Sequence, residues 1–276
     1  MGIATNRPYA VVTGASSGIG LELARECIEH DFDLLICAED PGIHEAARHL
    51  GAAGAAVEAV CADLSTYEGC EKLVDAVNAS ARDLDALLLN AGIGVGGSFL
   101  HNELDDELRV IGVNVVSVVH LAKRLVPRMV NRGRGRVLIT ASVASTSPAP
   151  YLAVYGATKA FDLSFAEALR YELADTGVTV TALQPGATDT EFFERADMEN
   201  TKVAQSQKDD PAEVAKKGFE AMMEGKDKVI AASLKSKLEG LAGEVLPETV
   251  KARMQGKQSK PGSGEKHTVR ELGKKH

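Results

Sequence analysis

Tyr155 and Lys159 have the clearest chemical potential in this chain, because they stand four residues apart in the segment Tyr-Gly-Ala-Thr-Lys. Residues at this spacing share one face of a helix, so we expect the Lys159 ammonium beside the Tyr155 phenol. A neighbouring positive charge lowers the phenol pKa from about 10, which would let the phenol exchange a proton near neutrality. Ser142, thirteen residues before Tyr155, could hold a substrate oxygen. The three residues predict general acid–base chemistry.

A glycine-rich segment near the N-terminus predicts a binding site for a phosphate-bearing ligand. It reads Thr13-Gly14-Ala15-Ser16-Ser17-Gly18-Ile19-Gly20 and follows a short β-rich run. Glycines let the backbone approach a pyrophosphate, and the N-terminus of the following helix offers unpaired N–H groups to the anion. A tight strand-to-helix turn also needs glycine for backbone reasons alone. The position of the segment at the first strand–helix junction favours the binding interpretation.

Carboxylates follow the next two predicted strands. Glu39 stands where a dinucleotide fold meets the adenosine ribose, and a carboxylate there bonds the 2′-hydroxyl and repels a 2′-phosphate. No Arg or Lys follows Glu39 immediately, so Glu39 favours NAD over NADP, although Glu39 and Asp40 could also be an exposed acidic turn. Asp63, next to Leu64, could accept from the adenine amino group or cap a helix at its N-terminus.

The elements that position these residues alternate between strand and helix. Apolar runs predict strands at 9–13, 33–37, 56–61, 86–89, 136–140, 178–183 and 228–231, and helical patterns lie between them, notably at 103–131 and 152–175. This alternation predicts an α/β fold with a doubly wound parallel sheet in a single domain. We expect a catalytic domain over residues 1–232, a helical extension over 233–254 and a disordered basic tail over 255–276.

Composition excludes several other classes of protein. The formal net charge is −8, which argues against nucleic acid or an anionic membrane as the main partner. No apolar run reaches the ~20 residues of a membrane span, and the N-terminus lacks the apolar core of a signal peptide. The four cysteines form no CxxC pair and have no histidine at ligand spacing, so we expect no metal and a cytoplasmic location.

In combination, these motifs resemble the short-chain dehydrogenase/reductase family over about Tyr9 to Thr190. The Asn90-Ala91-Gly92 segment after the fourth predicted strand is part of that resemblance. It implies a Rossmann fold, a bound nicotinamide dinucleotide, and a catalytic tetrad of Asn114, Ser142, Tyr155 and Lys159. Asn114 would hold a water in a proton relay. The nicotinamide end would be contacted by Pro185, Gly186, Thr188 and Thr190.

The chain departs from the family pattern at two places. Leu89 replaces the first asparagine of Asn-Asn-Ala-Gly, and the glycine-rich ending after the last strand is missing. The second departure concerns the contacts that the family makes through its C-terminal end when it forms tetramers. A homodimer or homotetramer is still expected, through the apolar faces of the segments at 103–131 and 155–175.

The sequence thus predicts an oxidoreductase that transfers a hydride between NAD, or NADP, and a small carbonyl or alcohol substrate, with Tyr155 as general acid and base. Two alternatives remain open. One is a regulator that binds a dinucleotide without turnover. The other is an enzyme of the sugar-nucleotide epimerase type, which shares the Tyr and Lys but usually carries a larger second lobe.

Overall fold

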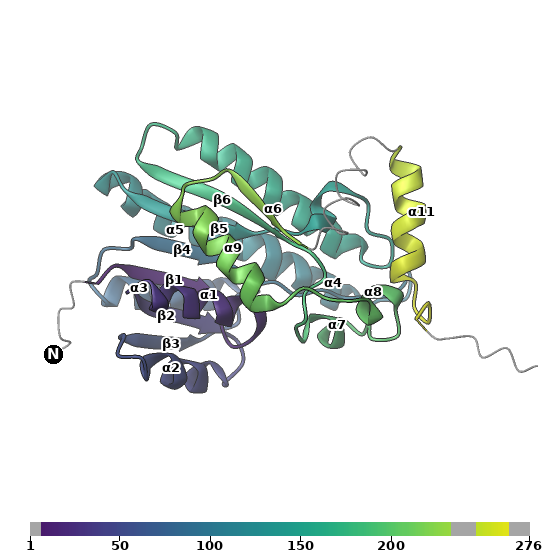
Figure 1. Cartoon of the computed structure of the whole chain (residues 1–276), viewed down its shortest axis with the longest axis horizontal. Helices are drawn as coiled ribbons and strands as arrows, with labels where there is room; N and C mark the ends of the chain where they lie inside the picture. Colours follow the sequence, from purple (N-terminus) through teal and green to yellow (C-terminus); the bar gives the residue numbers. More distant parts are fainter. Residues whose placement is uncertain (1–6, 233–246, 265–276) are drawn as a thin grey trace, which may run out of the picture.

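Seven parallel strands form one sheet, in the order β3-β2-β1-β4-β5-β6-β7 (Figure 1). The structure is a computed structural model that describes residues 7–232 and 247–264. The strands are β1 (Tyr9–Thr13), β2 (Asp33–Ala38), β3 (Val57–Cys61), β4 (Ala86–Leu89), β5 (Gly135–Thr140), β6 (Val178–Pro185) and β7 (Lys228–Ala231). The strand order reverses between β1 and β4, where ligands bind in sheets of this kind. The predicted doubly wound sheet is confirmed.

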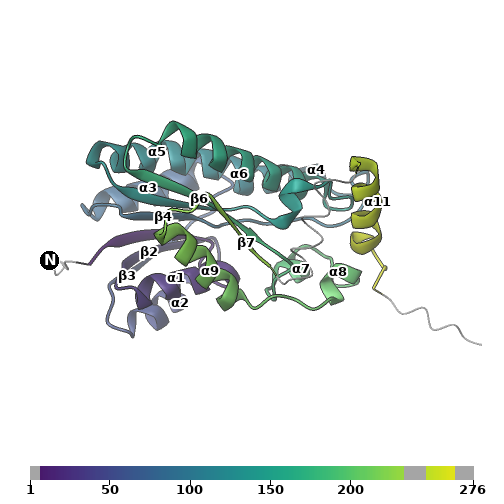
Figure 2. The ribbon, with the colours of Figure 1, turned by 45° about the horizontal axis from the view of Figure 1, so that its top comes forward.

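Helices cover both faces of the sheet (Figure 2). One face carries α1 (Gly18–Glu29), α2 (Ile43–Gly51) and α9 (Pro211–Met223), and the other carries α3 (Tyr67–Ala79), α5 (Ser117–Arg132) and α6 (Ala153–Glu172). Successive strand residues point to opposite faces, so Val11 belongs to the core under α3 and α5 whereas Val12 belongs to the core under α1 and α9. Because helices cover both faces of the sheet, every residue of β1 and β4 is buried.

The helical pattern predicted at 103–131 is interrupted in the middle. It comprises α4 (Leu104–Ile111), a π-helical turn η1 (Gly112–Val116) and α5. A π-helical turn inserts an extra residue into the helix and often marks a functional site. By length and composition the combined helix could span a membrane, but half of its most apolar window is buried inside the protein, as in the core helix of a soluble protein.

Three short helices lie beyond the carboxyl ends of the strands: α7 (Phe192–Arg195), α8 (Lys202–Gln205) and α11 (Glu248–Ser259). Helix α11 packs against α8 (Figure 1). The prediction of a disordered tail from residue 255 is wrong for residues 255–264. The Gly264 N–H donates to the Asn200 carbonyl at 2.9 Å, and the Ser263 hydroxyl accepts from the Lys202 N–H at 3.0 Å.

Because polar contacts hold this end of the segment 255–264, the spacing of apolar residues does not predict its structure. The predicted helical extension at 233–254 falls partly on α11, while residues 233–246 and 265–276 lie outside the described residues.

Candidate active site

The glycine-rich turn joins β1 to α1 at the rim of a cavity of about 330 Å³. Gly14 has a φ of +68°, and a Cβ on Gly20 would lie 2.0 Å from the Gly14 carbonyl oxygen, so side chains are excluded from both positions. The cavity is lined here by Gly14, Ser16, Ser17, Gly18, Ile19 and Gly20. A turn that presents backbone and the start of a helix to a cavity is suited to a pyrophosphate.

Asn90 joins the ends of three neighbouring strands. Its backbone N–H donates to the Thr13 hydroxyl at 2.9 Å, its side-chain amide donates to the Thr13 carbonyl at 3.2 Å, and its amide oxygen accepts from the Thr140 hydroxyl at 3.0 Å. The Ala91 N–H also donates to the Thr13 hydroxyl. Asn90, Ala91 and Gly92 line the cavity, so this network fixes the wall at the point where the strand order reverses.

The carboxylates that follow β2 and β3 lie near a cation that the sequence does not reveal. Glu39 pairs with Arg109 of α4, and the Arg109 guanidinium is 4.0 Å from an Asp63 carboxylate oxygen. Gly112 follows Arg109 by one helical turn. A Cβ on Gly112 would lie 3.0 Å from the Ser65 carbonyl oxygen, so the chain passes close to Ser65 and α4 lies at this edge of the cavity. The expectation that no compensating cation stands near Glu39 is therefore wrong, because Arg109 reaches it from a distant part of the chain.

Asp63 closes a turn and caps no helix. Its carboxylate accepts from the Ser65 N–H at 2.9 Å, whereas α3 begins at Tyr67 with Thr66 as its capping residue. Burial raises the pKa of Asp63, but the hydrogen bonds from Ser65 and the Arg109 charge outweigh it, and the net pKa is lowered. Asp63 and Leu64 both line the cavity, as does Glu39.

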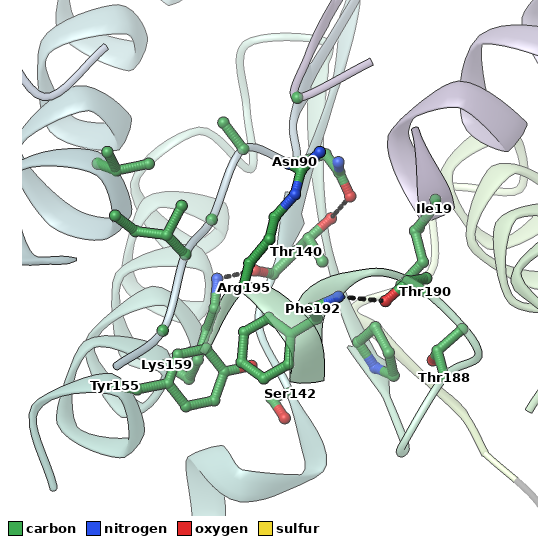
Figure 3. A pocket seen from close by; sticks show the side chains of 18 of the residues that line it. Ile19, Asn90, Thr140, Ser142, Tyr155, Lys159, Thr188, Thr190, Phe192 and Arg195 are labelled. Carbon is green, nitrogen blue, oxygen red and sulfur yellow. Dashed lines mark hydrogen bonds between the residues drawn. The ribbon is translucent and has the colours of Figure 1, made fainter. Parts of the chain in front are cut away.

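Ser142, Tyr155 and Lys159 gather on one wall of the same cavity (Figure 3). Ser142 follows β5 and caps a 3₁₀ turn, η2 (Val143–Thr146), by accepting from the Ala144 N–H at 3.1 Å. The Lys159 ammonium is buried and donates to the Thr140 carbonyl at 2.8 Å. Tyr155 packs against the ring of Phe192 at a centroid distance of 5.0 Å. The predicted helix face therefore brings a phenol, an ammonium and a hydroxyl together.

The net pKa of Tyr155 is raised, in contrast to the sequence-based expectation of a lowered value. Burial raises it most, the Lys159 charge and a hydrogen bond with Ser142 lower it, and the Asp162 charge raises it again. Desolvation disfavours the phenolate more than a single nearby ammonium favours it. The spacing of Tyr155 and Lys159 predicts the effect of the ammonium but not the burial of the phenol or the Asp162 charge.

Asn114 lies on the π-helical turn η1 and is fully buried. Its amide nitrogen donates to the Ile93 carbonyl at 3.0 Å and to the Thr158 hydroxyl at 2.9 Å, and its amide oxygen accepts from the Ile93 N–H at 2.9 Å. Both amide protons are therefore used within the protein. The Asn114 side chain thus connects the loop after β4 to α6 by hydrogen bonds. Its role in holding a water stays a prediction.

The segment after β6 forms the side of the cavity opposite Lys159. Pro185, at the end of β6, lines the cavity together with Gly186, Thr188 and Thr190. Figure 3 shows Thr188 and Thr190 across from Lys159. The Thr190 hydroxyl accepts from the Phe192 N–H at 3.3 Å and the Thr188 hydroxyl donates to the Gly186 carbonyl at 3.0 Å. Glu191 links this segment to the glycine-rich turn, because it accepts from the Ser17 hydroxyl at 3.4 Å and from Arg195 at 2.5 Å.

At its other end the cavity is lined mostly by apolar side chains, together with Arg195. The apolar lining residues there are Val143, Pro148, Ala149, Leu152, Phe192, Phe193 and Val203. Gln255 and Ser259 of α11 add two polar side chains at this end. Both residues fall in the segment predicted to be a disordered tail, so the sequence did not indicate that they line the cavity.

A Rossmann-type sheet with an acid–base group beside the glycine-rich turn defines an oxidoreductase that uses a dinucleotide. The family model described as short chain dehydrogenase matches residues 8–201. The chain belongs to the short-chain dehydrogenase family. The resemblance found in the sequence is thereby confirmed, together with the class of NAD(P)-dependent oxidoreductase acting on hydroxyl or keto groups.

Three similar proteins support this assignment. A 1-deoxy-11-beta-hydroxypentalenate dehydrogenase from Streptomyces exfoliatus is 39% identical over 185 residues, 66% of this chain and 67% of that protein. A short-chain dehydrogenase from Sphingobium yanoikuyae, solved with NADPH, is 29% identical with a TM-score of 0.76, covering 86% of this chain and 93% of that one. A short-chain dehydrogenase/reductase from Burkholderia phymatum, solved with NAD, is 25% identical with a TM-score of 0.78, covering 87% and 94%.

Proposed function

We propose that this protein interconverts a secondary alcohol and a ketone that carry an apolar body, with Tyr155 as the general acid and base. The observation that carries the proposal is the meeting of Ser142, Tyr155 and Lys159 on one wall of the cavity that begins at the glycine-rich turn. A proton donor, a hydroxyl and an ammonium beside a dinucleotide-type turn suit hydride transfer to a carbonyl.

The chain's own residues supply the proton and the positioning. A nicotinamide dinucleotide supplies or accepts the hydride when it is bound. In reduction, Ser142 and Tyr155 hold the substrate oxygen, and Tyr155 donates its phenolic proton as that oxygen becomes an alkoxide. Lys159 stabilises the phenolate that remains, because its ammonium lowers the free energy of the negative charge. In oxidation the phenolate takes the proton back.

The donor set fits a dinucleotide along the whole cavity. The glycine-rich turn and the start of α1 would hold the pyrophosphate, Asp63 and Leu64 the adenine, and Lys159, Pro185, Gly186, Thr188 and Thr190 the nicotinamide end. Glu39 would accept from the adenosine 2′-hydroxyl and so favour NAD. Its pairing with Arg109 makes this preference modest, since the cation offsets the repulsion of a 2′-phosphate.

The apolar end of the cavity supports a substrate with a hydrocarbon body. The Phe192 ring packs at a tilt against the Tyr155 ring, and Leu152 and Phe193 belong to one small apolar cluster next to it. Burying a hydrocarbon group there is favourable at about 25 cal/mol per Å², whereas a multiply hydroxylated sugar would leave polar groups unsatisfied. Gln255 and Ser259 provide two polar contacts for the far end of the substrate.

A screen of alicyclic and aryl ketones and alcohols with NADH, NADPH and their oxidised forms tests the proposal. We expect turnover on bulky apolar ketones to exceed turnover on small hydroxylated ones. Tight dinucleotide binding without turnover on any member would favour a regulator instead. Turnover only with sugar nucleotides would favour the epimerase alternative.

We also propose a homodimer, or a homotetramer that contains it, formed through α4, α5 and α6. These helices and the turn η1 leave apolar side chains exposed, namely Leu104, Leu108, Ile111, Val116, Val119 and Phe161. Helix α6 buries the face with Gly156 and Leu163 and exposes Ala157, Ala160 and Ala168 on the other, which permits close approach of a second copy.

We propose that residues 1–232 act as one catalytic domain, that α11 completes the substrate end, and that the enzyme works in the cytoplasm. The free cysteines among the described residues and the acidic composition support that location.

A further inference from the structure

Asp162 is a buried carboxylate that hydride transfer as described above does not use. It lies on α6, three residues after Lys159, and its side chain is 1% exposed. One carboxylate oxygen accepts from the Lys159 ammonium at 3.0 Å, and the other has no hydrogen-bond partner among the described residues. A buried charge of this kind is costly unless it is paired, so Asp162 depends on Lys159.

Asp162 also fixes where the Lys159 ammonium stands. That ammonium donates to Asp162 and, at 2.8 Å, to the Thr140 carbonyl at the end of β5. Two of its three N–H groups are thereby used, and the ammonium nitrogen lies next to Gly92 at the cavity wall. One N–H remains for a ligand in the cavity.

Lys159 and Asp162 both act on the Tyr155 phenol through their charges. Their charges are opposite and close together, so their effects on the phenol partly cancel. The side chains of η1, η2 and the upper end of β5 that face this region are neutral: Asn114, Ser142, Ser145 and Thr140. The charged residues on the described elements that pack against α6 are Asp105, Asp106, Glu107 and Arg109 of α4, Arg136 of β5, and Glu194 and Arg195 of α7, whose Phe192 packs against Tyr155.

Of these residues, only the arginines could compensate the Asp162 charge. Arg109 pairs with Glu39, Arg195 pairs with Glu191, and Arg136 lies near the start of β5, at the opposite end from Thr140.

We propose that Asp162 is a positioning residue that holds the Lys159 ammonium against Thr140 and offsets part of its charge. In consequence, Tyr155 keeps its proton to a higher pH than it would beside Lys159 alone. The inference rests on the proposed function of Tyr155. Asp162 thereby favours the protonated phenol, which is the form that a reduction needs.

The test is Asp162→Asn, which removes the charge and keeps the size of the side chain. Titration of Tyr155 is measured in the dinucleotide-free protein from phenolate absorbance, as the difference between each protein and the same protein carrying Tyr155→Phe. We expect the Tyr155 titration to move to lower pH, by about one unit, because removing the Asp162 charge leaves the Lys159 ammonium unopposed. The pH profile of kcat/KM for alcohol oxidation should move in the same direction.

Glu167→Gln is the matched control. Glu167 lies on the same helix, carries the same charge, is half exposed and pairs with Lys228. We expect the Tyr155 titration in Glu167→Gln to superimpose on that in the unsubstituted protein. An Asp162→Asn titration that also superimposes on it would overturn the proposal.

Stability gives a second readout that needs neither turnover nor a well-folded Asp162→Asn protein. Lys159→Met leaves the buried Asp162 charge unpaired and should lower the melting temperature. Adding Asp162→Asn to Lys159→Met should raise it again. A double variant that melts no higher than Lys159→Met would contradict the pairing. Loss of the Tyr155 role would show instead as full activity in Tyr155→Phe with the titration shift intact.

Discussion

Replacing Arg109 by Gln should widen the preference for NAD over NADP. Arg109 is the cation that pairs with Glu39 and approaches Asp63 at the cavity edge where the adenosine ribose is proposed to lie. Without Arg109 both carboxylates face a 2′-phosphate uncompensated. NAD carries no such phosphate, so its binding should change little.

The magnitude follows from the charges and their exposure. The side chains of Arg109 and Glu39 are 39% and 47% exposed, so water screens them. A unit charge pair at about 4 Å in water is worth about 1 kcal/mol, and a 2′-phosphate carries a charge of about −1.5 to −2. Removing the cation should therefore cost about 1–2 kcal/mol, which lowers kcat/KM for NADP by about 5- to 30-fold.

The assay is kcat/KM with both dinucleotides, together with calorimetric binding of each to the protein without substrate. Arg124→Gln is the matched control, since Arg124 lies on α5, is exposed and pairs with Glu71 away from the cavity. Glu39→Arg should shift the preference in the opposite direction, toward NADP. If Arg109→Gln leaves the ratio of the two dinucleotides as it is in the unsubstituted protein, Arg109 does not act on the 2′ position.

Three further predictions concern pH, the glycine-rich turn and assembly. Because burial raises the pKa of Tyr155, kcat/KM for oxidation should rise with pH through neutrality. The kcat/KM for reduction should stay level and fall only above that pKa. An oxidation rate independent of pH would be inconsistent with a phenolate base. Gly20→Ala places a Cβ 2.0 Å from the Gly14 carbonyl oxygen and should cost about 1–3 kcal/mol of stability and weaken dinucleotide binding, whereas Gly51→Ala, with nothing within 4 Å, should do neither in thermal melts and calorimetry. Leu108→Glu should convert the assembly to monomers in light scattering, and an unchanged mass would place the interface elsewhere.

Local patterns in the sequence predict most of the fold and the centre of the site. The strands follow from short apolar runs, and each predicted strand ends within two residues of its observed bounds. Tyr155 and Lys159 are found by helical spacing, because one helix places both on the same face. The same spacing argument would have found Asp162, three residues beyond Lys159, had buried acids been considered.

Contacts between distant segments could not be predicted in this way. Arg109 meets Glu39 across 70 positions, where Gly112 packs closely against Ser65. The π-helical turn that positions Asn114 leaves no mark in the apolar pattern of 103–131. Helix α11 is held partly by polar contacts to the segment around α8, so its sequence resembles that of a solvated tail.

Turnover and dinucleotide affinity of Tyr155→Phe, measured side by side, test the proposed chemistry most directly. The substitution removes the phenolic hydroxyl and keeps the ring that packs against Phe192. We predict a fall in kcat of about 100-fold or more, since general acid–base catalysis contributes about 10²–10⁴, with a dinucleotide Kd within a few-fold of the unsubstituted protein. Tyr151→Phe, which alters a tyrosine with no lysine four residues on, should remain active. Retention of more than about a tenth of kcat in Tyr155→Phe, a barrier change of only ~1.4 kcal/mol, would contradict the role of Tyr155 as acid and base.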